Sequence, residues 1–176
     1  MPIRVFMYLT LSFLVWSCTS NRSLQDDGTA ERALLELQDR VALKALVDRF
    51  SVLADRRDVA GQLLLFTDTA TVTSYRDGIV SSQLTGKAEI GSAFVNFLGL
   101  FDTVYHLNGQ QTVALQGDRA SGTAYCLVVL IGEQDGQRIR TTFGVRYEDN
   151  YVKRDDRWLI NERKSYFNWQ DVRPVD

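Results

Sequence analysis

Asp102-Thr-Val-Tyr-His-Leu-Asn-Gly-Gln-Gln-Thr-Val-Ala-Leu115 is the stretch that decides the fold, because it predicts one long strand with a break in its middle. It holds His106, the only histidine of the chain, directly after Tyr105. Asn108-Gly109 interrupts the alternation, and a glycine inside a strand is typical of a bulge or sharp bend. On a strongly curved sheet, such a bend would turn His106 toward a concave face.

Three further strands are expected after this one. Their predicted ranges are 119–132, 138–152 and 157–168, separated by turn sequences at Gly117-Asp118, Asp135-Gly136 and Asp155-Asp156. Because each turn joins one strand directly to the next, the four strands are predicted to form an antiparallel meander. Strands this long twist strongly, so the sheet should curl.

Helices precede the meander. A long helix is expected from Thr29 to about Ala54, since Thr29 can act as an N-cap and no proline follows within that range. Two apolar rows on this helix predict a broad buried arc. The rows are Leu35, Ala42, Leu46, Phe50, Leu53 and Leu34, Leu37, Val41, Ala45, Val52. A short helix at 59–66, a strand at 68–75, a returning strand at 79–84 and a third helix at 86–98 follow.

This order predicts an α+β fold. Three N-terminal helices should pack on a strongly bent, mostly antiparallel sheet, which gives a cone-shaped half-barrel with a cavity in its mouth. No internal repeat or second domain is evident in the sequence.

The first 18 residues are expected to lie outside this domain. Arg4 precedes an apolar run from Val5 to Trp16, which is the pattern of a secretory signal peptide and is short for a membrane span. Ser17-Cys18 resembles a bacterial lipobox, in which Cys18 is lipidated, and the alternative is an ordinary cleaved signal with an incidental cysteine. The polar residues 19–29 suggest a flexible tether to a domain at 30–170. We therefore expect an exported bacterial protein at the cell envelope, attached to the membrane through a lipid anchor only.

Composition limits the function. The net charge is −2 and no basic run occurs, so nucleic acid is not expected as a partner. One histidine and two cysteines cannot build a zinc site from the usual nitrogen and sulfur ligands, so no metal site is expected. Cys126 lies in an apolar strand and should be a buried structural thiol.

Seven short strings carry a resemblance to a known family. They are Leu46-Val-Asp-Arg-Phe50, Ala54-Asp-Arg-Arg-Asp58, Leu65-Phe-Thr-Asp-Thr-Ala-Thr-Val72, Gly86-Lys-Ala-Glu-Ile90, Tyr105-His-Leu-Asn-Gly109, Gly117-Asp-Arg-Ala120 and Arg157-Trp-Leu-Ile160 with Arg163. In this order they resemble the SnoaL-like, scytalone-dehydratase-like branch of the nuclear transport factor 2 superfamily. The resemblance implies a cone-shaped barrel that commonly forms homodimers through the open face of its sheet. It also implies that Asp55 and His106 meet in the cavity, while the second histidine of that branch is missing here.

These residues define a candidate catalytic pair. Asp55 would orient the imidazole of His106, which would remove a proton beside a carbonyl group and return it to a leaving hydroxyl, with no cofactor or metal. A hydroxyl of Tyr105, Tyr125 or Tyr147 would polarise the carbonyl. The remaining candidates for the cavity wall are Phe50 and Phe94. Arg163 is expected to pair with an acid rather than bind substrate. The acids and bases of Arg146-Tyr-Glu-Asp149 and of Lys153-Arg-Asp-Asp-Arg157 are expected to form a solvated face or dimer rim.

Two functions remain open. The first is a lyase or isomerase, dehydratase-like or ketosteroid-isomerase-like, that acts on a small apolar or aromatic oxygenated ligand. The second is a non-catalytic ligand-binding or dimerisation module anchored at the cell envelope.

Overall fold

A computed structural model describes residues 23–175, and side chains from residue 28 onward. The chain divides into two compact units, Met1–Leu34 and Leu35–Asp176. The described part of the first unit is helical. The predicted signal peptide and Cys18 lie outside the described residues. No helix within the described range is long and apolar enough to cross a membrane.

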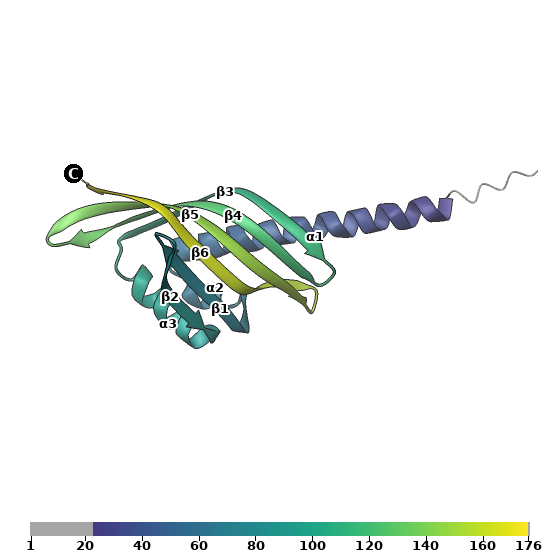
Figure 1. Ribbon diagram of the computed structural model, residues 1–176, viewed down its shortest axis with the longest axis horizontal. Coiled ribbons are helices and arrows are strands. Elements are labelled where there is room, and N and C mark those ends of the chain that lie inside the picture. The colour runs from purple at the N-terminus through teal and green to yellow at the C-terminus, as the bar shows by residue number, and fades with distance from the viewer. Residues whose placement is uncertain (1–22, 176) are drawn as a thin grey trace, which may run out of the picture. The chain divides into compact units, whose positions relative to one another are not determined.

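Within residues 23–175 the chain forms three α-helices and six strands (Figure 1). The helices are α1 (Ser23–Asp55), α2 (Val59–Leu63) and α3 (Gly86–Leu98). The strands are β1 (Phe66–Arg76), β2 (Ile79–Thr85), β3 (Thr103–Gln116), β4 (Arg119–Gln134), β5 (Gln137–Arg154) and β6 (Arg157–Pro174). The predicted order of elements is confirmed, and α3 has the predicted bounds.

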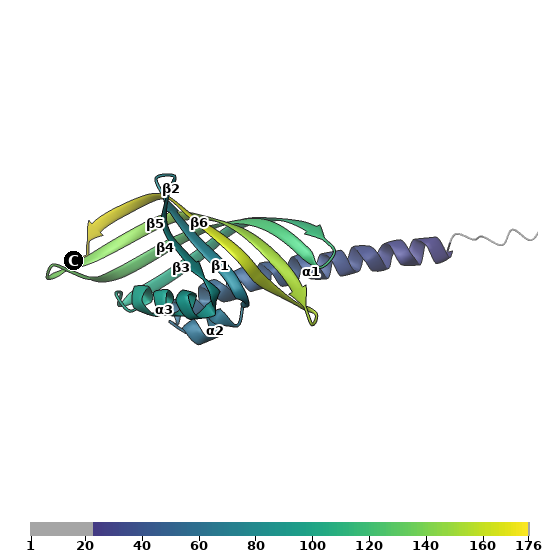
Figure 2. The same cartoon turned by 60° about the horizontal axis from the view of Figure 1, so that its bottom comes forward.

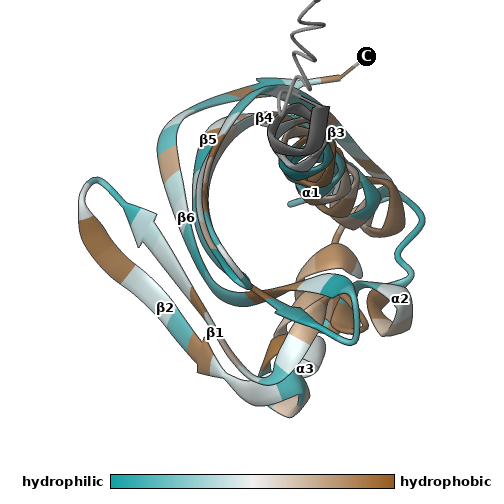
Figure 3. Cartoon of the chain, turned by 90° about the vertical axis from the view of Figure 1, so that its right-hand side faces the viewer, coloured by the Kyte–Doolittle hydropathy of each residue, from teal (hydrophilic) through white to brown (hydrophobic). Residues whose placement is uncertain are grey.

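The six strands form one sheet in the order β2-β1-β6-β5-β4-β3. All neighbouring pairs are antiparallel except β1 and β6, which run parallel. The view in Figure 2 follows this order from the β1–β2 hairpin to the edge strand β3. Seen end-on, the sheet curls without closing, with α2 and α3 on its inner side (Figure 3). The predicted α+β cone is therefore confirmed for residues 35–175.

Helix α1 begins at Ser23 rather than at Thr29, so residues 23–29 are helical where the sequence predicted an irregular, flexible segment. The stretch before Thr29 contains no proline, and a single glycine inside a helix costs only about 1 kcal/mol. Gly28 therefore does not stop the helix from extending toward its N-terminus.

The broad buried arc predicted for α1 is wrong. The buried apolar residues form one narrower face: Leu43, Leu46, Val47, Phe50, Leu53 and Ala54. Leu35 and Ala42 of the first predicted row, and the whole second row, are exposed. An apolar row shows that a helix can pack on that side, but burial requires a neighbouring element, and the curled sheet contacts α1 along one face only.

Two irregularities of the sheet set which side chains face inward. On β3, Asn108 pairs with Cys126 and Gln111 with Ala124, so the bulge predicted at Gly109 is confirmed. On β6, the partners of the consecutive residues Asn150 and Tyr151 are Glu162 and Ile160, which leaves Asn161 as an extra residue. Because a bulge shifts the alternation of side chains by one position, the inward-facing residues change from even to odd numbers between Asn161 and the next extra residue of β6, Asn168.

The core lies between the helices and the inner face of the sheet. Phe50, Phe66 and Phe94 meet edge to face there, with ring centroids 5.9 to 6.3 Å apart. Cys126 is buried, as predicted, and burial raises the pKa of its thiol to about 12. At neutral pH it is a protonated core side chain.

Candidate active site

Asp55 and His106 form a hydrogen-bonded pair. The carboxylate oxygen Oδ1 of Asp55 lies 2.7 Å from Nδ1 of the His106 ring. The side chain of His106 is 7% exposed and that of Asp55 is 27% exposed. The fold thus brings together two residues that are 51 positions apart in the sequence.

A second set of contacts fixes the position of β3 on α1. Beside the β3 bulge, the amide nitrogen of Asn108 donates to the carboxylate of Asp48 at 3.0 Å and to the backbone carbonyl of Val47 at 3.3 Å. The hydroxyl of Ser51 donates to the amide oxygen of Asn108 at 3.0 Å. These bonds hold the end of α1 against β3, where Asp55 meets His106.

The surroundings of His106 favour the neutral imidazole. Burial lowers its pKa below the ordinary value of 6.5, the hydrogen bond and the charge of Asp55 oppose this effect, and the positive charge of Arg163 adds to it. The neutral form therefore predominates at pH 7. With its proton on Nδ1 and shared with Asp55, the ring keeps a free lone pair on Nε2.

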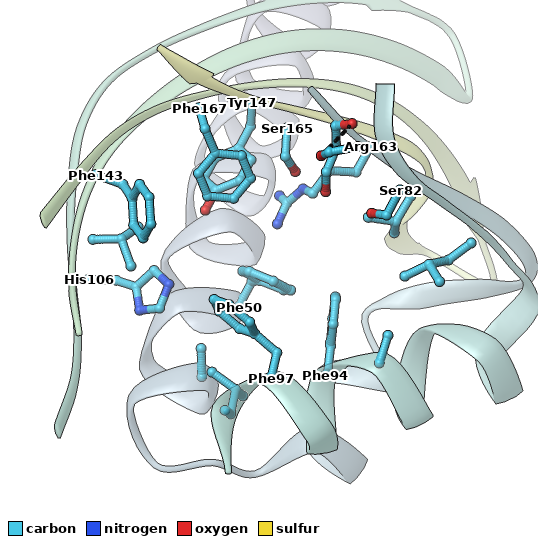
Figure 4. A pocket seen from close by; sticks show the side chains of 18 of the residues that line it. Phe50, Ser82, Phe94, Phe97, His106, Phe143, Tyr147, Arg163, Ser165 and Phe167 are labelled. Atoms are coloured by element: carbon cyan, nitrogen blue, oxygen red, sulfur yellow. Dashed lines mark hydrogen bonds between the residues drawn. The ribbon is translucent and has the colours of Figure 1, made fainter. Parts of the chain in front are cut away.

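His106 lines a cavity of about 400 Å³ on the inner side of the sheet. Figure 4 shows its ring directed into the hollow together with the guanidinium of Arg163. Most of the described wall is apolar and includes five phenylalanines: Phe50, Phe94, Phe97, Phe143 and Phe167. None of the described lining residues is an aspartate or glutamate, so Asp55 lies behind His106 rather than in the wall.

Arg163 is fully buried and lies between two aromatic rings. Its Cζ atom is 4.3 Å from the ring centroid of Phe50 and 4.4 Å from that of Tyr147. Its Nε and Nη2 donate to the two carboxylate oxygens of Asp149 at 2.8 and 2.7 Å, and the hydroxyl of Tyr151 donates to the same carboxylate at 2.9 Å. Its Nη1 is buried and has no hydrogen-bond partner among the described residues.

These contacts correct two predictions. Asp149 does not belong to a solvated face, because it is 3% exposed. Its position was readable from the sequence, since it alternates with Val145, Tyr147 and Tyr151, which are all buried. Arg163 pairs with an acid as expected, but it also lines the cavity, which the prediction had not included.

The predicted wall residues divide into two groups. Phe50, Phe94 and Tyr147 line the cavity. Tyr105 and Tyr125 do not: they are 52% and 41% exposed on the outer face of the sheet. Neighbouring residues of a strand point to opposite faces, so an inward His106 places Tyr105 outside, and the buried Cys126 does the same for Tyr125.

Sequence reasoning missed one polar residue of the wall. Gln62 of α2 is 1% exposed and lines the cavity. Its side chain donates from Nε2 to the backbone carbonyl of Phe50 at 3.4 Å. No sequence signal marked it, because α2 spans only five residues. Within residues 23–175, no three His, Cys, Asp or Glu side chains form a group that could hold a metal ion.

Comparison with known families gives a consistent result. Residues 35–164 match the model of a family described as a SnoaL-like domain. An uncharacterised protein of Mycobacterium tuberculosis is 25% identical over 131 residues, which cover 74% of this chain and 86% of that protein. A protein of Mycobacterium bovis matches with the same identity and coverage.

Solved structures show the same fold. The Kfla4162 protein of Kribbella flavida has a TM-score of 0.69 at 21% identity, covering 77% of this chain and 95% of that one. A scytalone-dehydratase-like protein of Novosphingobium aromaticivorans has a TM-score of 0.67 at 17% identity, covering 80% and 91%. The hexachlorocyclohexane dehydrochlorinase LinA-type3 of Novosphingobium barchaimii has a TM-score of 0.66 at 19% identity, covering 81% and 94%.

Proposed function

This chain belongs to the SnoaL-like family, and from that premise we propose that it is a lyase or isomerase whose own side chains move a proton on a small, largely apolar, oxygenated substrate. The observation that carries this proposal is the hydrogen-bonded pair of Asp55 and His106, with the imidazole in the wall of an apolar cavity. A fold of this type hosts unrelated functions, so the function is inferred from the residues of the site.

His106 acts as the general base. Its Nε2 takes a proton from the carbon next to a substrate carbonyl, and the electron pair of that bond moves toward the carbonyl oxygen. In an isomerisation the proton returns to another carbon, and in an elimination it leaves with the departing hydroxyl as water. A base with a pKa close to the working pH suits both reactions, and positioned acid-base groups contribute about 10²- to 10⁴-fold in rate.

Asp55 acts through His106 as a positioning residue. Its carboxylate accepts the Nδ1 proton, which selects the tautomer with a basic Nε2 and stabilises the imidazolium that forms during the reaction. Because Asp55 lies behind the ring and outside the cavity wall, it need not touch the substrate.

Arg163 and Tyr147 stabilise the charge that develops on the substrate oxygen. The buried Nη1 of Arg163 is a fixed donor without a partner among the described side chains, and it lines the same cavity as His106. Burial raises the pKa of Tyr147, so its phenol stays protonated and can donate as well. Fixed donors in a site with little water are effective at stabilising an oxyanion.

The names of two proteins with this fold agree with such chemistry. One is a scytalone-dehydratase-like protein and another is a hexachlorocyclohexane dehydrochlorinase, and both names denote eliminations. At 17% and 19% identity the likeness itself shows the fold alone, so the reaction class is proposed from the residues of the site and the substrate is left to experiment.

Substrates whose products are conjugated enones test the proposal. Bicyclic β,γ-unsaturated ketones and bicyclic β-hydroxy ketones both yield conjugated enones, which are followed by ultraviolet absorbance. We expect kcat/KM to fall about 10²- to 10⁴-fold in His106→Gln and Asp55→Asn. Asp118→Asn makes the same change in an exposed turn and should match the wild type.

The result that would overturn the proposal is equal turnover in the wild type, His106→Gln and Asp55→Asn. Circular dichroism of each variant shows that it is folded. A protein that binds these ketones but does not convert them would instead be a ligand-binding module.

We further propose that the chain forms a homodimer through the outer face of its sheet. This face carries exposed apolar and aromatic side chains, namely Tyr105, Leu107, Tyr125 and Trp169. A contiguous patch of this kind on a sheet is typical of a protein interface. The family commonly uses this face for pairing, which supports a second copy as the partner.

A further inference from the structure

We propose that Gln62 is a specificity residue that accepts a hydrogen bond from a hydroxyl group of the ligand. The proposal deepens the function proposed above and rests on it for the role of the ligand as substrate. It defines the substrate class as a hydroxylated, carbonyl-bearing ring compound.

The amide of Gln62 has a defined orientation. Its Nε2 donates to the backbone carbonyl of Phe50 at 3.4 Å. The flipped amide would place Oε1 against that carbonyl oxygen, so that two acceptors would face each other. The oxygen therefore points away from Phe50.

Oε1 of Gln62 is a buried acceptor that has no partner among the described residues. Buried polar atoms are almost always hydrogen-bonded, and an acceptor left without a donor costs free energy. Gln62 is 1% exposed and lines the cavity, so the cavity is where a donor would reach it.

A second unpartnered atom faces the same cavity and has the opposite character. Nη1 of Arg163 is a donor, whereas Oε1 of Gln62 is an acceptor. The third such atom within the described part of the chain, Nε of Arg140, does not belong to the cavity. A ligand that satisfies both atoms must carry a donor and an acceptor, and the phenylalanine-rich wall requires an apolar body between them.

Binding of a matched pair of ligands tests the inference without turnover. 2-Naphthol and 2-methoxynaphthalene share the ring and the oxygen, but only the naphthol can donate. Titration calorimetry should show about tenfold tighter binding of 2-naphthol to the wild type. Gln62→Met keeps the length of the side chain without the acceptor and should remove this preference.

Gln111→Met is the matched control. Gln111 also donates from its amide to a backbone carbonyl, that of Leu43 at 3.5 Å, but it does not line the cavity. This variant should keep the preference for the naphthol. If Gln62→Met does not fold, Gln62→Leu provides the same loss of acceptor.

Three results would overturn the inference. The first is an unchanged preference for 2-naphthol in the Gln62 variants, and the second is no preference in the wild type. The third is naphthol binding that survives Ala93→Trp, because Ala93 lines the cavity and the indole would fill it. Both readouts are independent of turnover, so a failure here is distinct from a failure of the His106 and Asp55 variants in the enone assay.

Discussion

Asp149→Asn should be the most informative substitution for the stability of the cavity wall. Asp149 is the counter-ion of Arg163, and both side chains are 1% exposed. The two residues share a pair of hydrogen bonds of 2.8 and 2.7 Å, from Nε and Nη2 to the two carboxylate oxygens. Asparagine keeps the shape of the side chain but has no charge and only one oxygen acceptor. The guanidinium would then be buried without a counter-ion.

The expected cost is large for a domain of this size. Breaking a buried ion pair by removing one partner costs about 3 to 5 kcal/mol, out of a total stability of about 5 to 15 kcal/mol. With a urea m-value of about 2 kcal/mol per molar, the unfolding midpoint should fall by about 1.5 to 2.5 M.

Urea unfolding followed by tryptophan fluorescence measures this shift, and Asp171→Asn is its matched control. Asp171 pairs with Arg173 at 2.9 Å, but the side chains are 39% and 65% exposed. An exposed pair contributes less than about 1 kcal/mol, so the same substitution there should hardly move the midpoint. The double variant Asp149→Leu/Arg163→Met removes both charges and should recover most of the loss.

Equal midpoints for Asp149→Asn and Asp171→Asn would refute the reasoning, because they would mean that the guanidinium finds water or another partner. A double variant as unstable as Asp149→Asn would also contradict it, since the loss would then come from packing rather than from an unpaired charge.

Four further predictions concern other parts of the chain. His106 is the only histidine, so its imidazole gives a single NMR titration, with a midpoint below 6.5 that falls further in Asp55→Asn because the opposing hydrogen bond and charge of Asp55 are removed. Because the unfolded chain binds this proton more readily, the contribution of His106 to stability is complete above about pH 6.5 and decreases as the pH falls through that value. Urea unfolding at several pH values measures this decrease in the free energy of unfolding, and the decrease should be smaller in His106→Gln. Leu107→Lys places a charge on the exposed outer face of the sheet and should convert a dimer to a monomer in light scattering, whereas a mass that is the same for both proteins would contradict the proposed interface. If Cys18 is lipidated, mass spectrometry of the protein from bacterial membranes should show acyl chains that Cys18→Ser lacks, and an unmodified thiol in the wild type would contradict the anchor.

Much of the fold was predictable because its signals are local. Strand alternation and turns such as Asp135-Gly136 predicted the meander, and Gly109 marked the bulge in β3 that the register confirms. The extent of burial on α1 was not local information. Val41 and Val52 lie on an apolar row, yet both are exposed, because periodicity shows which side of a helix is apolar and not whether another element covers it.

The candidate site was partly predictable. The meeting of Asp55 and His106 followed from the family resemblance, since no local rule joins residues so far apart in sequence. Alternation along the strand would have excluded Tyr105 once His106 was placed inward. The inward orientation of Arg163 could not be predicted from the sequence. Strict alternation from the buried Ile160 puts residue 163 on the outer face, and the sequence around Asn161 gives no sign of an extra residue.

The extra residue in β6 has a consequence for variants that differ in length. Deleting Asn161 would place Glu162 directly after Ile160 and restore an uninterrupted ladder, in which Glu162 still pairs with Asn150 and Arg163 with Asp149. Arg163 and Ser165 would therefore keep facing the helices, and Glu162 and Lys164 would keep facing away from them. A relative that lacks one residue at this position can thus present the same chemical lining to the hollow, so a single gap here is compatible with shared activity.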